Sequence, residues 1–289
     1  MVAMDAPLRA AYLARLGVEA EPPSVDALFR LHRAHVERVA YETLWIHLGE
    51  RWGIDPIDSA IRIAHEGRGG YCFHLNGALS ELLQALGYDV FRHVGGVHGV
   101  GGATEAELTN HLVLTVHQLP TDTNPTGVWY VDAGLGDALH EPLALIAGGF
   151  DQGPFHLVLT ETPGGVGRWH LAHDPLGSFA GMAWRSAPTG IDAFAERHRW
   201  LSSSPESGFV RVLTAQRRDA TGTDALRGLS LRRIGANALD RTLRTEAELF
   251  DVLGDLFELD VSAIEADRRQ ALFANVGAAH EAWEAAGRP

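Results

Sequence analysis

The feature that most restricts the fold is a change in the spacing of apolar residues near residue 88. Before this point apolar side chains recur every three or four residues, as on one face of a helix. The two clearest patterns are Leu28, Leu31, His35 and Val39, and then Leu75, Leu79, Leu82, Leu83 and Leu86. Gly87 follows the second pattern and is a typical helix stop. The spacing predicts a helical domain over residues 1–88.

Beyond residue 88 the pattern changes to short β runs separated by glycine, proline and asparagine. These runs cover residues 88–94, 111–117, 128–131, 155–160 and 169–172. Short strands with turn residues between them are typical of an antiparallel barrel or small sheet. We therefore expect a β-barrel domain over residues 89–200.

The last third of the chain mixes both kinds of pattern. Strands are predicted at 209–215 and 226–234, and Thr245 with Glu248 forms a capping box that opens a helix. That helix is expected to bury Leu249, Phe250, Leu253, Leu256 and Phe257. The overall prediction is an α+β protein whose residues 201–289 form an α/β lid domain.

Composition excludes several classes of function. The net charge is −13, which argues against a nucleic-acid or anionic-membrane surface. The chain has no lysine, so Schiff-base chemistry and a Gly-Lys-Ser/Thr phosphate loop are excluded. The first 17 residues lack an uninterrupted apolar run, so we expect neither a signal peptide nor a membrane anchor. A single cysteine allows no intramolecular disulfide and no cysteine-rich zinc site, so we expect a cytoplasmic protein with no metal.

That single cysteine, Cys72, is the first candidate functional residue. It follows Arg68-Gly69-Gly70-Tyr71 and precedes the helical pattern, so it is expected in the first turn of a helix. The free N–H groups and the positive end of the helix dipole favour the thiolate there. An inert buried cysteine remains the alternative.

A histidine and an aspartate are predicted to pair across a hairpin. His111 and Asp132 lie on two β runs joined by a turn-rich segment, residues 119–127. If the hairpin is symmetric about that segment, the two residues lie directly opposite each other. A carboxylate would then fix the tautomer of an imidazole that activates a thiol. A slip of one residue would place them on opposite faces.

Together, three segments resemble the arylamine N-acetyltransferase family in order and spacing. They are Arg68-Gly69-Gly70-Tyr71-Cys72, Asn110-His111-Leu112-Val113-Leu114, and Val131-Asp132-Ala133-Gly134-Leu135-Gly136. Upstream, Ala40-Tyr41-Glu42-Thr43-Leu44 is similar to the family's Pro-Phe-Glu-Asn-Leu element, and downstream residues 201–209 resemble its Ser-Pro-x-Ser-x-Phe stretch. The resemblance extends over nearly the whole chain.

The resemblance implies a cysteine-protease-like core with Cys72 as nucleophile, His111 as its base and Asp132 as the partner of the histidine. The implied reaction is ping-pong: acetyl-CoA acetylates Cys72, and an arylamine, hydrazine or related aromatic amine then takes the acetyl group. Contacts to CoA are implied for Gly134, Gly136 and Ser207, and an acceptor pocket for Tyr71, Leu135 and Phe209. Glu42 and Arg68 match a charged pair that supports the site.

Leu135 stands where the family usually has an aromatic residue, so an aromatic contact to the acceptor is absent. An amide synthase-like relative that uses another acyl donor therefore stays open. A transglutaminase-like thiol enzyme also stays open, because it shares the order Cys, His, Asp and a cysteine at the start of a helix. A protein that shares the fold but not the activity is a fourth possibility. The sequence leaves the oligomeric state open.

Overall fold

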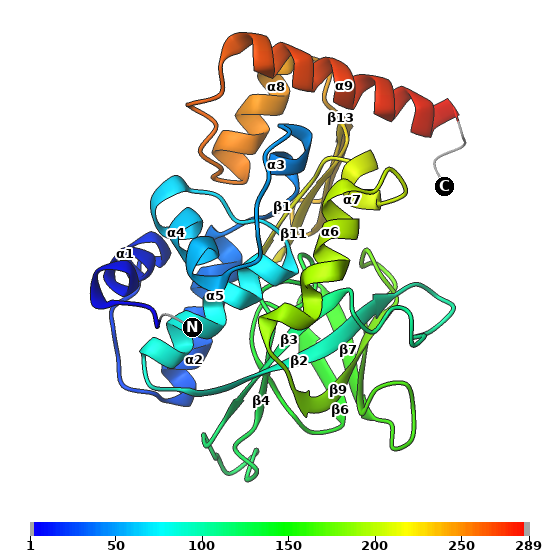
Figure 1. Cartoon of the computed structure of the whole chain (residues 1–289). Helices are drawn as coiled ribbons and strands as arrows, with labels where there is room; N and C mark the ends of the chain where they lie inside the picture. The colour runs from blue at the N-terminus through cyan, green and yellow to red at the C-terminus, as the bar shows by residue number, and fades with distance from the viewer. Residues whose placement is uncertain (1–2, 286–289) are drawn as a thin grey trace.

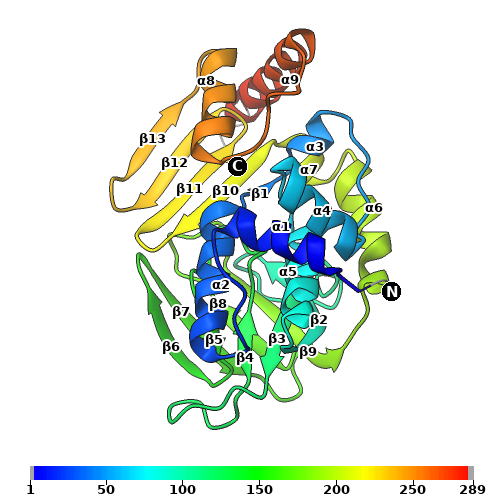
Figure 2. The same cartoon turned by 90° about the vertical axis from the view of Figure 1, so that its left-hand side faces the viewer.

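The computed structural model describes residues 3–285 and has the predicted α+β fold. Its N-terminal part contains α1 (Ala6–Leu16), α2 (Val25–Arg38), the short α3 (Leu44–His47), α4 (Pro56–Glu66) and α5 (Cys72–Ala85). Side-chain caps start three of these helices: the oxygen of Asp5, Ser24 or Asp55 accepts a backbone N–H of the first turn. Helix α5 lies at the centre of this layer (Figures 1 and 2), and most of its residues are buried.

The middle of the chain forms an eight-stranded antiparallel sheet in the order β5-β4-β3-β2-β9-β8-β7-β6. The strands are β2 (Asp89–His98), β3 (His111–His117), β4 (Trp129–Val131), β5 (Leu143–Ala144), β6 (Gly148–Gln152), β7 (Phe155–Glu161), β8 (Trp169–Ala172) and β9 (Gly181–Pro188). Side chains from β3, β4, β7, β8 and β9 share one apolar cluster. The sheet therefore curls around its own core as an open barrel, below the helices in Figure 1.

The C-terminal part contains a second antiparallel sheet in the order β1-β10-β11-β12-β13. It consists of β1 (Tyr41–Glu42), β10 (Thr214–Asp219), β11 (Gly222–Arg227), β12 (Ser230–Gly235) and β13 (Leu239–Thr242). Helix α8 (Glu246–Asp251), its π-helical continuation (Val252–Leu256) and α9 (Ala266–Ala285) pack on this sheet. A 3-10 turn (Ile191–Phe194), α6 (Ala195–Ser203) and α7 (Gly208–Arg211) connect it to the barrel.

Two predicted strands of the last third were wrong in detail. Residues 209–211 belong to the short helix α7, because Ser207 accepts the Phe209 N–H and starts a helical turn; strand β10 begins only at Thr214. Residues 226–234 are not one strand but the two arms of a hairpin, which turns at Gly228 (φ 60°). Glycine adopts this left-handed conformation without steric cost, so the turn fits there. The predicted capping box of α8 is confirmed.

Strand β1 belongs to the N-terminal part of the chain but pairs with a strand of the C-terminal part. Tyr41 pairs with Gln216 and Glu42 with Ala215, so a segment of the N-terminal part is an edge strand of the C-terminal sheet. The division into three domains at residues 88 and 200 stays a prediction, and residues 1–2 and 286–289 of its outer ends lie outside the described part. No helix within residues 3–285 is long and apolar enough to cross a membrane.

Candidate active site

Cys72 is the first residue of α5, as predicted. The residues before it turn tightly: Gly70 has φ 92°, and a Cβ at Gly69 would lie 2.0 Å from the Ala40 carbonyl oxygen. The thiol lies 3.6 Å from the Asn110 carbonyl oxygen and is nearly buried. The start of the helix thus presents one thiol, its own free N–H groups and the positive end of the helix dipole to the same point.

His111 and Asp132 meet, although not in the predicted register. The His111 Nε2 atom lies 2.7 Å from Oδ2 of Asp132, and both side chains are almost completely buried. The ladder pairs Leu114 with Val131 and Thr115 with Tyr130, which is two residues away from the symmetric pairing. The connecting loop has a positive φ at Gln118 and at Gly127, and these two residues flank a loop centred on the observed register rather than on the predicted one. A shift of two residues keeps every side chain on its face, so the predicted pair survives.

The surroundings of His111 favour its charged form. Burial opposes ionisation of the ring, but the negative charges of Asp132 and Cys72 and hydrogen bonds to both side chains raise its pKa to about 10. Because Nε2 is bonded to Asp132, Nδ1 is the nitrogen left for the thiol. The three side chains thus place the imidazole of His111 between the carboxylate of Asp132 and the sulfur of Cys72.

Asn76 holds this arrangement together and was missed by the sequence reasoning. Its Nδ2 donates to Oδ1 of Asp132 at 2.7 Å and to the Leu112 carbonyl at 2.6 Å, and its Oδ1 accepts the Ala133 N–H at 2.9 Å. Asn76 lies four residues after Cys72 on α5, hence on the same helix face. That spacing was the signal that could have identified it.

Tyr130 is the second supporting residue that sequence reasoning missed. Its hydroxyl donates to Oδ2 of Asp132 at 2.8 Å, while the Gly134 N–H reaches Oδ1 at 3.0 Å. Burial and the Asp132 charge raise the pKa of Tyr130 well above its usual range, so the phenol stays a donor. The Asp132 carboxylate therefore accepts hydrogen bonds from Asn76, His111, Tyr130 and Gly134, which compensates its burial.

The predicted pair Glu42 and Arg68 is also present. The Arg68 guanidinium lies 3.2 Å from Oε1 of Glu42, and both side chains are buried. The other carboxylate oxygen accepts the Leu44 N–H at 2.6 Å, and the Glu42 N–H donates to the Gly70 carbonyl at 2.9 Å. The pair joins β1 to the loop that leads into Cys72.

The three residues for which CoA contacts are predicted lie in different surroundings. Gly134 lies against Cys72: an added Cβ would be 2.7 Å from the cysteine Cα. Gly136 has φ 72° and packs on the side chain of Gln216. Ser207 is fully buried, caps Phe209 and donates to the Leu201 carbonyl at 2.6 Å, so its position gives no support to a CoA contact.

The predicted acceptor-pocket residues lie on two sides of Cys72. Tyr71 is buried, its ring lies 5.1 Å from that of Phe209, and its hydroxyl is 2.5 Å from Nδ1 of His198. Leu135 packs instead into the barrel core. The aromatic side of the site is extended by Trp45, which stacks near Tyr71 at 6.0 Å.

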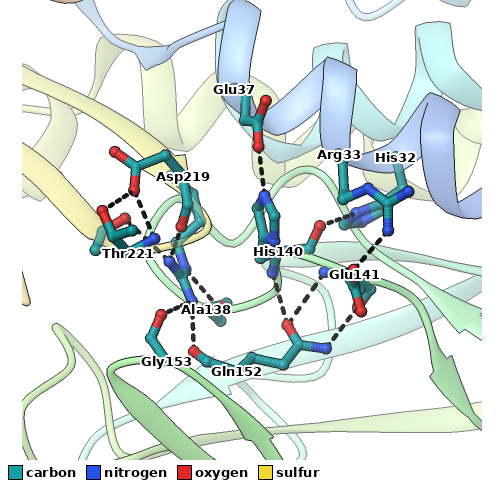
Figure 3. A network of polar contacts seen from close by, with 12 residues as sticks. His32, Arg33, Glu37, Ala138, His140, Glu141, Gln152, Gly153, Asp219 and Thr221 are labelled. Carbon is teal, nitrogen blue, oxygen red and sulfur yellow. Dashed lines mark hydrogen bonds and ion pairs between the residues drawn. The ribbon is translucent and has the colours of Figure 1, made fainter.

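The loop that follows Gly136 is tied to both neighbouring layers (Figure 3). The His140 ring reaches Glu37 of α2 at 2.6 Å, and its backbone N–H donates to Oε1 of Gln152 at 2.7 Å. Arg33 and Glu141 form an ion pair at 2.6 Å. The loop is thereby held between α2 and the barrel.

A buried arginine fixes the other end of the same loop. The guanidinium of Arg218 donates to the backbone carbonyls of Ala138 at 3.3 Å and Gly153 at 2.8 Å, and it is 1% exposed. Burial lowers its pKa to about 10, so it remains a cation at neutral pH. These contacts connect the C-terminal sheet to the segment that carries Gly134 and Gly136.

A cavity of about 550 Å³ opens between the five-stranded sheet, α9 and the turn at residues 176–178. Arg211, Arg227 and Arg232 line it, and within residues 3–285 their side chains form no hydrogen bond or ion pair. The Asp137 carboxylate also faces the cavity but is engaged by Ser178, whose N–H and hydroxyl lie 2.7 and 3.0 Å away. Asp240 lines the cavity as well, so three arginines stand against two carboxylates on a protein of net charge −13.

An α+β fold that places a helix-initial cysteine beside a histidine held by an aspartate has the arrangement of a thiol enzyme. A sequence model of the N-acetyltransferase family matches residues 24–266. The chain belongs to this family and is an acyltransferase.

Individual relatives agree with that assignment. A pineal gland arylamine N-acetyltransferase isozyme, NAT-3 of Gallus gallus, is 28% identical over 257 residues, which are 79% of this chain and 84% of that protein. Proansamycin X synthase of Amycolatopsis mediterranei is 30% identical over 175 residues, 56% of this chain and 65% of that protein. The structure of Mycobacterium marinum arylamine N-acetyltransferase in complex with CoA superposes with a TM-score of 0.80 at 25% identity, covering 92% of this chain and 97% of that one.

Proposed function

We propose that the protein transfers an acetyl group from acetyl-CoA, through a thioester on Cys72, to an arylamine, a hydrazine or a related aromatic amine. The observation that carries the proposal is the buried contact of His111 with Asp132, 2.7 Å long, next to the helix-initial Cys72. The family supports acetyl transfer, and a relative binds CoA in its solved structure.

In the first half-reaction the Cys72 thiolate attacks the thioester carbonyl carbon. The new C–S bond forms as the carbonyl π electrons move to oxygen, and collapse of the intermediate expels the CoA sulfur, which takes a proton from His111. In the second half-reaction the amine attacks the acyl-Cys72 carbonyl, His111 accepts a proton from the amine nitrogen, and the Cys72 thiolate leaves. Asp132 keeps the imidazole oriented in both directions.

The arginine-lined cavity is the proposed position of the phosphate end of CoA. Guanidinium groups suit phosphate because they present several donors in one plane. Within residues 3–285 the side chains of Arg211, Arg227 and Arg232 form no ion pair, and they outnumber the two carboxylates that line the cavity, Asp137 and Asp240. Gln216, which packs on Gly136, lines the same cavity. The pantetheine arm would then run past Gly136 toward Cys72.

The test is intact-protein mass spectrometry after brief mixing with acetyl-CoA, repeated with Cys72→Ala. We expect one acetyl group on the wild type and none on the variant. Addition of aniline or phenylhydrazine should discharge the acetyl group. No adduct on well-folded wild-type protein would refute acetyl-CoA as the donor.

The open alternatives give different results in the same experiment. A transglutaminase-like enzyme would release ammonia from a glutamine peptide without CoA. An amide synthase-like relative would be acylated by a longer thioester and not by acetyl-CoA. The match covers 84% of the Gallus gallus isozyme NAT-3 and 96% of the Mycolicibacterium smegmatis arylamine N-acetyltransferase, against 65% of the proansamycin X synthase, which favours the acetyl donor.

A further inference from the structure

Tyr41 lies on β1, next to a residue of the arginine-lined cavity and to the cluster that contains Cys72. It pairs directly with Gln216, and directly opposed residues in a sheet project to the same face. Gln216 lines the cavity, and Tyr41 and Gln216 together line a small pocket with Asp132 and Gly136. On its other side Tyr41 packs against the cluster that contains Cys72, and its ring lies 6.2 Å from that of Phe209.

The Tyr41 hydroxyl has no hydrogen-bond partner within residues 3–285. The other four of the five tyrosines have one: Tyr12 with His35 at 2.8 Å, Tyr71 with His198 at 2.5 Å, Tyr88 with the Ser24 carbonyl at 3.3 Å, and Tyr130 with Asp132 at 2.8 Å. Tyr41 is half-buried, and a phenol in such a position normally finds a partner. Its free hydroxyl is therefore available to a group that enters from the cavity.

Burial, followed by the negative charge of Cys72, raises the pKa of Tyr41 well above its usual range. The charges of Arg227 and Asp137, which both line the cavity, act on the same group. The phenol therefore stays protonated at neutral pH and keeps its proton as a hydrogen-bond donor.

We propose that the Tyr41 hydroxyl is a catalytic group of this enzyme: it donates a hydrogen bond to the carbonyl oxygen of the acyl group while Cys72 attacks it. This inference rests on the proposed acyl transfer. The phenol donates without losing its proton, the negative charge that forms on the acyl oxygen is stabilised, and the proton that balances the departure of the CoA sulfur still comes from His111. The Pro-Phe-Glu-Asn-Leu element that this segment resembles has phenylalanine at this position, so Tyr41 adds a hydroxyl to that element.

The test compares Tyr41→Phe with Tyr88→Phe, which also loses one phenol hydroxyl but on the far end of α5, where it bonds only to the Ser24 carbonyl. Three rates are measured on each protein: acylation of Cys72 by acetyl-CoA, acylation by p-nitrophenyl acetate, and alkylation by iodoacetamide. Both acylations create a negative carbonyl oxygen, whereas alkylation does not. Loss of one such donor lowers an acyl-transfer rate by about 10²-fold or more.

We expect Tyr41→Phe to slow both acylations by about 10²-fold with an unchanged alkylation rate, and Tyr88→Phe to leave all three rates unchanged. Equal losses in acylation and alkylation would mean that the hydroxyl acts on the thiol or on the fold, and would overturn the inference. Unchanged acylation by both donors would also overturn it. A wild type that reacts with p-nitrophenyl acetate but not with acetyl-CoA would refute the proposed donor and leave the Tyr41 comparison intact.

Discussion

Replacing Asn76 by alanine should lower the stability of the protein and, separately, the rate at which Cys72 is acylated. The change removes three hydrogen bonds, to the Leu112 carbonyl, the Ala133 N–H and the Asp132 carboxylate, from a fully buried position. A buried partner left without its hydrogen bond costs about 1–3 kcal/mol. Asp132 keeps its other donors, so the two backbone groups dominate, and we expect the free energy of unfolding to fall by about 3–5 kcal/mol.

The same change should slow catalysis, because Asn76 fixes Asp132 against His111. With one of the two hydrogen bonds to Oδ1 lost, the carboxylate is held less firmly in its 2.7 Å contact with the imidazole. We expect acylation of Cys72 to slow by about 10–100-fold, the order expected when a positioned acid–base group is weakened. The assay is single-turnover acylation by acetyl-CoA at a temperature where denaturation curves show the variant to be fully folded.

Asn124→Ala is the matched control. Asn124 is also fully buried, and its amide donates to the Val128 carbonyl at 2.8 Å while its oxygen accepts from Thr126 at 2.7 Å. It lies in the loop between β3 and β4, away from Cys72, so we expect a comparable loss of stability with wild-type acylation. If Asn76→Ala acylates as fast as Asn124→Ala, the positioning role of Asn76 is refuted.

Two further predictions concern the neighbours of Cys72. Because the pKa of His111 is raised to about 10, its ring should keep both protons at pH 8. His35, whose pKa burial lowers to about 3, should be neutral at the same pH. Nitrogen-15 NMR of histidine-labelled protein tests both expectations, and a titration of His111 near pH 6.5 would contradict the first. Gly134→Ala puts a Cβ 2.7 Å from the Cys72 Cα and should lower both the melting temperature and the acylation rate. In the control Gly148→Ala the added Cβ meets open space, so neither quantity should change. A Gly134→Ala variant with wild-type acylation would show that the two backbones can separate without cost.

Local signals in the sequence were sufficient where a structure is made by neighbouring residues. The capping box of α8 needs only Thr245 and Glu248, and both of its hydrogen bonds are present at 3.2 and 3.1 Å. The position of Cys72 at the start of a helix likewise depends on the glycines just before it and the apolar pattern just after it. Such contacts span a few residues and involve little loop-closure entropy.

Contacts between distant segments were not predictable from the sequence in the same way. Nothing in the spacing of residues 41–42 indicates that they pair with residues 215–216, because these segments are separated by most of the chain. The position of Tyr41 beside Gln216 follows from that pairing and could be found only in the structure.

The His111–Asp132 contact shows why a prediction can survive an error in its geometry. The symmetric hairpin was wrong by two residues, but side chains alternate with a period of two, so the error left both residues on their predicted face. Asp132 also lies just beyond the end of β4, where its side chain is set less by the ladder than by the groups it accepts from. Those groups come from α5, β3, β4 and the following loop. The contact therefore depends on the sheet face to which His111 and Asp132 project and on hydrogen bonds to four segments. A change in the hairpin loop that keeps both side chains on that face should preserve the site.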